Sequence, residues 1–290
     1  MTRMYSWNAL RLLGMRCEVC FRHCDLKEGQ TGYCRARHNV NGRIEARNYG
    51  VITSLALDPI EKKPLYRFFP GSRILSLGSY GCNLRCPFCQ NYEISQTDDT
   101  GFERADPEWI LSIAERERKN GNIGVAYTYN EALVGYEFVR DTARMVQRAG
   151  MKNVLVSNGT AELAVLQEIL PYIDAMNIDL KSFSKEVYRD VLQGDLDQTL
   201  SFIEEAAKSC HMEITTLIVP GINDSAGEIR EIASWIAGLN GGKGKEIPYH
   251  ISRFFPQYKM TDREATDRRL IYSLAEAARE SLEYVYEGNV

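Results

Sequence analysis

Three cysteines lie close together in the stretch GCNLRCPFCQN, at Cys82, Cys86 and Cys89. Their thiolates are soft ligands that suit zinc or an iron–sulfur cluster. A closed structural zinc site needs four protein ligands, usually as two Cys-x2-Cys pairs, and the second pair does not lie near this loop. A four-iron cluster held by three thiolates leaves one iron open to a small molecule. The spacing therefore favours a cluster with a working position over a zinc knuckle.

A second group of four cysteines lies nearer the N-terminus, in the spacing Cys-x2-Cys-x3-Cys-x9-Cys. Its members are Cys17, Cys20, Cys24 and Cys34. Four thiols in so short a segment form a complete ligand set, which predicts a second metal site holding structural zinc or another iron–sulfur cluster. His23 and His38 are alternative ligands. Disulfides are the other interpretation, and a reducing cytoplasm disfavours them.

The totals describe an ordinary globular chain of 290 residues, 44% of them hydrophobic, with a net charge of −4. This charge gives no argument for a nucleic-acid or anionic-membrane partner. No run approaches the roughly 18 apolar residues of a membrane span. The first residues, MTRMYSWNALRLLG, lack the apolar core and cleavage site of a secretory signal, so we expect a cytoplasmic protein. The lone Cys210 is expected to be a buried core thiol.

Strand-like and helix-like stretches alternate from residue 73 onward. The expected strands are RILSLGS, GVAYTYNE, NVLVSNG, AMNIDLK, HMEITTLIVPG and PYHISRFF, with EYVYEGN as a candidate for a short last strand. A helical stretch follows each of the six. The first helix has Asp106 as its N-cap, Pro107 in its first turn and Gly121 as its stop.

Six strand–helix units at regular spacing predict an α/β fold with a parallel sheet. Six units form a partial (β/α)6 barrel of the TIM type, because eight are needed to close one. We expect residues 73–290 to form this barrel, and residues 1–72 to form a small Cys-rich extension with a short hairpin in GRIEARNYGVITSLAL. The stretch 58–72, with three prolines, reads as a connector. Functional residues should follow the C-terminal ends of the strands.

Charged and polar side chains do occur where the strands end. Asn130 and Glu131 offer an acceptor and a negative charge to an ammonium group, although a carboxylate also suits the positive end of the next helix. Asn158 can bind a ribose or a carboxylate, or can act as a helix N-cap. Alternation along a strand directs Asp179 and Lys181 to the same side, where they face a cavity or form a structural ion pair.

Two further candidates lie near the later strand ends. Val219 ends an apolar strand before Pro220-Gly221, and simple core packing explains it equally well. His250 lies in the strand PYHIS, and a lone histidine is as often structural as functional. The sequence therefore predicts a functional site at this edge of the sheet, and Val219 and His250 are its least specific candidates.

The Cys-x3-Cys-x2-Cys spacing after the first strand of such a repeat resembles that of the radical S-adenosylmethionine (SAM) superfamily. The resemblance implies a 4Fe–4S cluster on Cys82, Cys86 and Cys89, whose open iron chelates the amino and carboxylate groups of SAM. It also implies that an electron from the cluster cleaves SAM to a 5′-deoxyadenosyl radical, which abstracts a hydrogen atom.

The resemblance also implies roles for the residues at the strand ends. In activases of glycyl-radical enzymes, a Gly-Gly-Glu motif meets the SAM amino group; here the match is YTYNE, which retains Glu131 and lacks both glycines, so this inference is weaker. Asp179 and Lys181 are expected to contact the ribose and carboxylate of SAM. Val219 is expected to face the adenine, and His250 to lie near the substrate. Asn130 and Asn158 complete the set of expected cofactor-binding residues.

The whole chain is similar to the radical SAM enzymes of the AmmeMemoRadiSam system, whose sequences resemble the activating enzyme of pyruvate formate-lyase. The shared stretches include CEVCFRHC, EGQTGYC, ALDPIEKKPLYRFFPGS, YTYNEAL, NIDLK, EITTLIVPGIND, HISRFFPQYKM and YVYEGN. The resemblance implies an oxidoreductase that works anaerobically with an external electron donor of the flavodoxin or ferredoxin type. It suggests a protein substrate or partners of the Ammecr and Memo families. The four-cysteine segment is absent from the simplest activases, so the substrate of those activases cannot be assigned to this chain.

Two other classes of function compete with an activase-like radical enzyme. One is radical SAM modification of RNA, a peptide or a small molecule, and the lack of a basic patch in the sequence counts against RNA. The other is a non-enzymatic electron carrier that metal sites stabilise. Such a carrier has no use for an open iron. The sequence therefore favours a hydrogen-abstracting radical enzyme and leaves its substrate open.

Overall fold

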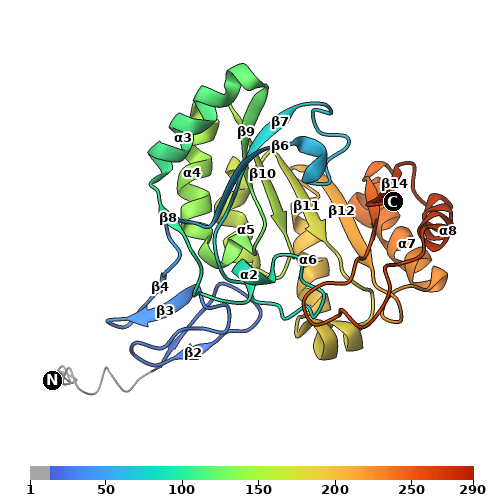
Figure 1. Ribbon diagram of the computed structural model, residues 1–290, viewed down its shortest axis with the longest axis horizontal. Helices are drawn as coiled ribbons and strands as arrows, with labels where there is room; N and C mark the ends of the chain where they lie inside the picture. The colour runs from blue at the N-terminus through green and yellow to red at the C-terminus, as the bar shows by residue number, and fades with distance from the viewer. Residues whose placement is uncertain (1–13) are drawn as a thin grey trace.

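The centre of the molecule is an eight-stranded sheet in which neighbouring strands are also neighbours in the chain. The computed structural model describes residues 14–290 (Figure 1). The strands follow the order β6 (Ser54–Pro59), β7 (Arg73–Gly78), β9 (Asn122–Tyr127), β10 (Lys152–Ser157), β11 (Ala175–Asp179), β12 (His211–Ile218), β13 (Tyr249–Arg253) and β14 (Val285–Gly288). The strands from β7 to β14 are parallel, and β6 is antiparallel to β7. The predicted α/β fold with a mostly parallel sheet is therefore confirmed.

Helices connect the successive parallel strands and cover the sheet. In Figure 1, α3 and α4 flank it at one end, and α7 and α8 flank it at the other. The helices are α3 (Pro107–Arg116), α4 (Tyr136–Arg148), α5 (Leu163–Ile169), α6 (Leu196–Ala206), α7 (Ala226–Gly242) and α8 (Arg268–Arg279), and α2 (Tyr92–Ser95) is a single turn. Shorter helical turns are η1 (Ile60–Lys62), η2 (Glu117–Asn120), η3 (Ala132–Gly135), η4 (Leu170–Tyr172), η5 (Val187–Leu192) and η6 (Gly244–Glu246). Because helices cover them, the central strands β10 and β11 are almost wholly buried.

The first of these helices shows how local sequence sets its ends. The Asp106 carboxylate accepts a hydrogen bond from the backbone N–H of Trp109 at 2.8 Å, and Pro107 occupies the first turn. The helix continues into η2, after which Gly121 adopts a φ of +85°, a conformation that favours glycine. The start and stop signals in the sequence are confirmed here.

The N-terminal segment contains short strand pairs outside the main sheet. They are β1 (Met15–Arg16) with β2 (Asp25–Leu26), β3 (Arg37–Val40) with β4 (Arg43–Ala46), and β5 (Val51–Ile52) with β8 (Glu103–Arg104). A hairpin is present, but its predicted position is wrong, because β4 pairs with the strand before it. The turn is Asn41-Gly42, both with positive φ, which is the pair that a tight hairpin turn favours. The stretch VITSLAL divides between β5 and β6 instead.

Residues 58–72, which we call the floor segment, connect β6 to β7 and also contribute side chains to the core. Their apolar side chains Ile60 and Leu65 are fully buried. They pack in one cluster with residues near the starts of three strands, namely Ile74, Val154 and Ala175. These contacts place the floor segment, in spite of its prolines, over the N-terminal ends of the strands.

A buried carboxylate fixes the floor segment to the sheet. Glu213 on β12 accepts hydrogen bonds from the backbone N–H groups of Tyr66 and Arg67, at 3.0 and 2.8 Å. Its carboxylate also accepts from the ring nitrogens of His211 and His250, at 2.9 and 2.6 Å. Although burial raises the pKa of Glu213, these four bonds lower it to about 2.

Among residues 14–290, no helix is both long and apolar enough to cross a membrane. The expectation about a secretory signal rests on the first residues of the chain. Residues 1–13 lie outside the part that the structure describes, so this expectation stays a prediction.

Replacing Glu213 by glutamine is expected to destabilise the fold at neutral pH. The folded pKa of about 2 lies below the unfolded value of about 4.3, so the stabilisation is complete above pH 4.3 and is lost as the pH falls towards 2. We expect Glu213→Gln to lower the free energy of unfolding by about 3 kcal/mol at pH 7 and by about half as much at pH 3. Urea unfolding of the metal-free chain measures both values. The exposed Glu283→Gln is the control, and equal losses at the two pH values would contradict the assignment.

Candidate active site

The loop that carries the three clustered cysteines follows β7 and ends at α2. Cys86 is buried, and Cys82 and Cys89 are half-buried. The backbone N–H of Leu84 points at the Cys82 sulfur, 3.4 Å away. We call residues 79–91 the cysteine loop.

Burial raises the pKa of all three thiols, that of Cys86 to about 12. The ammonium group of Lys181, at the end of β11, acts in the opposite direction on Cys86 and Cys89. The thiols are therefore protonated at neutral pH in the metal-free chain. A metal that binds them must displace these protons, so binding strengthens as the pH rises.

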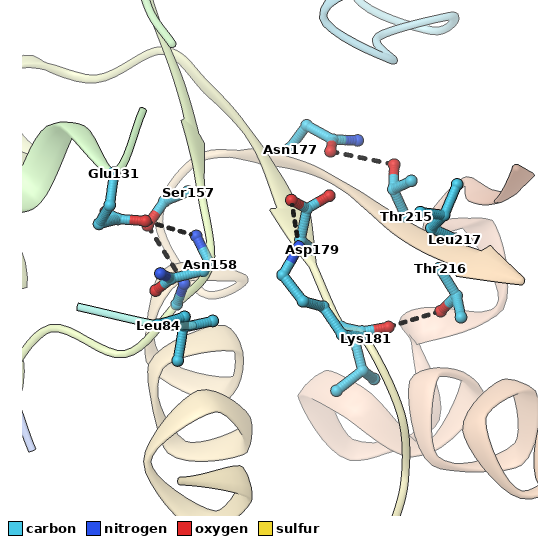
Figure 2. Close-up of polar contacts among 12 residues, drawn as sticks. Leu84, Glu131, Ser157, Asn158, Asn177, Asp179, Lys181, Thr215, Thr216 and Leu217 are labelled. Atoms are coloured by element: carbon cyan, nitrogen blue, oxygen red, sulfur yellow. Dashed lines mark hydrogen bonds and ion pairs between the residues drawn. The ribbon is translucent and has the colours of Figure 1, made fainter. Parts of the chain in front are cut away.

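Glu131 lies just beyond β9 and is buried. Its carboxylate accepts hydrogen bonds from the Ser157 hydroxyl and the Asn158 backbone N–H, each at 2.8 Å (Figure 2). It also accepts one from the Leu133 backbone N–H at 3.2 Å. Burial raises the pKa of Glu131 in spite of these bonds. The bond to Leu133 caps the turn η3, so the expected helix-start role and a ligand-binding role are compatible in one side chain.

Asn158 belongs to the loop after β10 and binds the cysteine loop. Its Nδ2 donates to the Asn83 side-chain oxygen at 2.9 Å and lies 3.7 Å from the Cys82 sulfur. Its Oδ1 accepts from the backbone and the hydroxyl of Thr160. The following helix begins at Leu163 with Glu162 as its N-cap, so Asn158 is not the helix cap considered from the sequence.

Asp179 and Lys181 meet at the end of β11, as the alternation predicts. The Lys181 Nζ lies 2.9 Å from the Asp179 carboxylate (Figure 2). Burial lowers the pKa of Lys181, but the negative charge of Asp179 acts in the opposite direction, and the pKa is raised overall. Lys181 is therefore a cation beside the cysteine loop, and the pair exists as an ion pair that faces a cavity.

One cavity of about 640 Å³ lies between the cysteine loop and the floor segment, and nine of the ten residues predicted for the active site border it. They are Cys82, Cys86, Cys89, Asn130, Glu131, Asn158, Asp179, Lys181 and His250. This size suits a cofactor together with a small group of a substrate. Except for His250, these side chains come from the C-terminal ends of neighbouring parallel strands or from the loops that follow them.

Val219 is the exception. Its side chain is fully buried in the main apolar core, as the simpler interpretation had it. His250 is near the start of β13, where it bonds Glu213 and packs against Tyr66, with ring centroids 4.9 Å apart. It faces the floor end of the cavity, away from the cysteine loop.

Asp58 and Lys63, which were not predicted as site residues, form a polar cluster with Tyr129 at the floor end of the cavity. The Asp58 carboxylate accepts hydrogen bonds from Lys63 at 2.9 Å and from the Tyr129 hydroxyl at 2.6 Å. Tyr129 has a φ of +71°, the left-handed conformation that glycine adopts most easily. This is one of the two positions where the activase motif has glycine. The absence of both glycines from the motif was the sequence signal for this cluster. The phenol ring of Tyr129 occupies space that a glycine would leave empty.

The other cysteine group also converges in space. Cys17, Cys20, Cys24 and Cys34 border one small cavity, and all four are free thiols. Within residues 14–290, no three His, Cys, Asp or Glu side chains are arranged to hold a metal ion directly. The second metal site therefore stays a prediction. Cys210 is half-buried and its thiol lies 3.5 Å from the Ala206 carbonyl oxygen.

Residues 77–236 match the family model of the radical SAM superfamily. The match covers more than half of the chain, from β7 into α7. The chain therefore belongs to the radical SAM superfamily, a family that implies a 4Fe–4S cluster and SAM as cofactors.

The chain is also similar to individual curated proteins. The chain is 41% identical over 280 residues to an uncharacterized protein of Methanocaldococcus jannaschii, a match that covers 95% of this chain and 81% of that protein. It is 27% identical over 188 residues to pyruvate formate-lyase 1-activating enzyme of Escherichia coli, covering 62% of this chain and 75% of that enzyme. The (2S)-3-sulfopropanediol dehydratase activating enzyme of Klebsiella oxytoca is 27% identical over 128 residues, 44% of this chain and 40% of that enzyme. Family and relatives together support an enzyme, and the predicted similarity to pyruvate formate-lyase activating enzyme is confirmed.

Solved structures share the fold at low sequence identity. SuiB of Streptococcus suis, bound to S-adenosylmethionine, matches with a TM-score of 0.56 and 14% identity, over 74% of this chain and 51% of that one. HydG, a maturase of the FeFe-hydrogenase, matches with a TM-score of 0.57 and 12% identity, over 73% of this chain and 50% of that one. At these identities the likeness concerns the fold alone.

Asn130 is expected to support the cysteine loop. Its Nδ2 donates to the carbonyl oxygens of Tyr80 and Gly81, and its Oδ1 accepts from the Ser79 N–H at 3.0 Å. We expect Asn130→Ala to lower the free energy of unfolding by about 2 kcal/mol, because buried backbone groups lose their partners. Urea unfolding measures this loss, with the exposed Asn120→Ala as control. Unchanged stability with weaker SAM binding would show instead that Asn130 contacts the cofactor.

Proposed function

We propose that this chain is a radical SAM enzyme whose 4Fe–4S cluster is held by Cys82, Cys86 and Cys89. The shared cavity carries the proposal, because three thiols face the same space as charged and amide side chains from the ends of β9, β10 and β11. The donor set fits the group. The three soft thiolates of Cys82, Cys86 and Cys89 would hold a four-iron cluster and would leave one iron open to a ligand.

The charged residues of the cavity suit the methionine part of SAM. The Glu131 carboxylate is already oriented by Ser157 and Asn158, and it accepts the ammonium group of SAM. Lys181 attracts the SAM carboxylate, while Asp179 and Asn158 hydrogen-bond the ribose hydroxyls. Burial of these groups strengthens each interaction relative to water. A cluster bound here supplies the electron that cleaves SAM to a 5′-deoxyadenosyl radical.

The reaction that follows is abstraction of a hydrogen atom from a substrate. The similarity to activating enzymes supports a mechanism of the glycyl-radical activase type, with an external flavodoxin or ferredoxin as the electron donor. The motif resemblance supports an enzyme of the AmmeMemoRadiSam system, with a protein substrate or Ammecr and Memo family partners. A cytoplasmic and anaerobic setting suits such a cluster. His250 and Tyr129, at the floor end of the cavity, lie on the side left for the substrate.

We extend the proposal to the division of the chain into two parts. Residues 73–290 form a partial (β/α)6 barrel, and residues 1–72 form a Cys-rich extension whose strand β6 joins the edge of the barrel sheet. The four thiols of that extension are the ligands of a second centre, zinc or iron–sulfur. The sequential order of the parallel strands supports the barrel.

Anaerobically reconstituted protein, given SAM and dithionite, is expected to release 5′-deoxyadenosine. Cys86→Ala removes one of three cluster ligands and should lower the yield at least about 100-fold. Liquid chromatography of the nucleoside measures the yield. Cys210→Ala is the matched control, because it removes a thiol outside both groups and should leave the yield unchanged. Equal yields from the wild type and Cys86→Ala would show that the nucleoside does not arise at the cysteine loop.

Glu131→Gln is expected to weaken SAM binding about tenfold, because it replaces a charge-assisted bond to the ammonium by a neutral one. The amide retains the shape of the side chain and most of its acceptor role. SAM titration followed by the EPR signal of the reduced cluster measures the affinity. Glu186→Gln, on the exposed surface, is the control. An unchanged SAM affinity would remove Glu131 from the cofactor site.

A further inference from the structure

The four N-terminal cysteines surround one small space. Cys17, Cys20 and Cys34 are buried, and Cys24 is half-buried. The space measures about 10 Å³, room for a single water-sized sphere. Arg37 borders it as well. Four thiols that converge on so small a volume form a ligand set for a soft metal and not a site for an organic molecule.

Arg37 provides a second, independent observation at this space. Its side chain is 5% exposed, and one end of the guanidinium binds the Glu137 carboxylate at 2.7 Å. Its Nε has no hydrogen-bond partner among the described residues. A buried N–H without an acceptor is costly. A metal-bound thiolate of Cys17, which borders the same small space as Arg37, is the acceptor that this group lacks.

Two arginines connect this segment to the cysteine loop. The Arg22 Nε donates to the Asn83 carbonyl oxygen at 2.7 Å. Arg85 donates to the Tyr33 carbonyl oxygen and, at 2.9 Å, to the Cys82 carbonyl oxygen. Both guanidinium groups lie over the Tyr33 ring, 3.5 and 3.7 Å from its centroid. The connection thus combines charge-assisted hydrogen bonds with cation–π contacts.

The two segments are also in direct backbone contact. Gly81 has a φ of +95°, and a Cβ there would lie 2.5 Å from the Cys34 carbonyl oxygen. The Phe21 N–H donates to the Thr160 carbonyl oxygen, so the segment also reaches the loop after β10. A shift of the N-terminal thiols therefore moves the backbone on which Cys82 and Asn158 depend.

Asn83 joins the two cysteine groups through a single buried side chain. Its amide donates to the Thr160 hydroxyl at 2.8 Å and accepts from the Asn158 Nδ2 at 2.9 Å. On its other side, the Asn83 carbonyl oxygen accepts the hydrogen bond from Arg22, which lies between Cys20 and Cys24 in the chain. Asn158 in turn lies 3.7 Å from the Cys82 sulfur. Hydrogen bonds and close contacts thus lead from the segment of the four N-terminal cysteines to the Cys82 sulfur.

We propose that Cys17, Cys20, Cys24 and Cys34 bind a soft-metal centre that positions Asn83 and, through it, the SAM-binding cysteine loop. The inference rests on the proposed function, because the positioned loop is the one assigned to the cluster. Asn83 is a positioning residue that acts through Asn158 and the loop backbone. The N-terminal strands β1 and β2 have only two residues each, so a metal supplies the rigidity that secondary structure does not.

The centre is tested in a chain that lacks the other thiol group. A variant with Cys82, Cys86 and Cys89 all changed to Ala should retain one zinc or about four irons per chain after anaerobic purification. Inductively coupled plasma mass spectrometry counts the metal and tells zinc from an iron–sulfur cluster. Adding Cys24→Ser should weaken retention at least about tenfold, whereas adding Cys210→Ser should not.

Circular dichroism checks that these chains fold, and Cys24→His, which keeps a metal ligand, should restore part of the metal. A triple variant that holds no metal overturns the proposal. So does one in which the metal survives Cys24→Ser unchanged.

The positioning role is tested with the other thiol group intact. Asn83→Asp keeps the shape of the side chain but removes its donor and adds a charge. We expect it to retain the iron of the cysteine loop while the SAM concentration needed to change the cluster EPR signal rises about tenfold. Asn153→Asp, an equally buried change at a distance from both thiol groups, should leave that concentration within about twofold of wild type. A wild-type response in Asn83→Asp overturns the positioning role. If the wild-type signal itself does not respond to SAM, the proposed function fails, and the metal count of the triple variant still decides the centre.

Discussion

The hydrogen bonds to the buried Glu131 carboxylate hold the candidate site together. A carboxylate in this position is costly unless polar partners surround it, and its partners come from the loop after the next strand, at Ser157 and Asn158. Asn158 also binds Asn83 in the cysteine loop. One charged group therefore fixes the spacing between the ends of β9 and β10 and the thiols. The parallel register of these strands brings all three to the same edge.

Much of this arrangement follows from local sequence and one rule of topology. The strands from β7 to β13 were predictable because apolar runs alternate with amphipathic stretches and because caps such as Asp106 are explicit. The candidate residues followed from the rule that parallel strands present their C-terminal ends together. That rule places Glu131, Asp179 and Lys181 around one cavity although the sequence separates them by as many as fifty positions.

The remaining features depend on contacts between distant residues. The prolines of the floor segment read as a loop, and only the folded chain buries Ile60 and Leu65. Alternation shows that Val219 points inward but does not tell a cavity from a packed core. Asn83 is an ordinary residue between two cysteines until Thr160 and Asn158 meet its amide. The displaced hairpin had a local signal, since Asn-Gly favours a tight turn.

Both cysteine groups belong to the first third of the chain, but the partners that enclose them come much later. Arg22 binds the carbonyl of Gln193, 171 positions away, and Asn83 binds Thr160, 77 positions away. Contacts of such long range form late in folding, and a nascent chain emerges from its N-terminus. The thiols therefore face solvent at least until the chain has been synthesised past Gln193, beyond β11. Metal donors and oxidants can therefore reach these sulfurs during synthesis, before the folded protein encloses them.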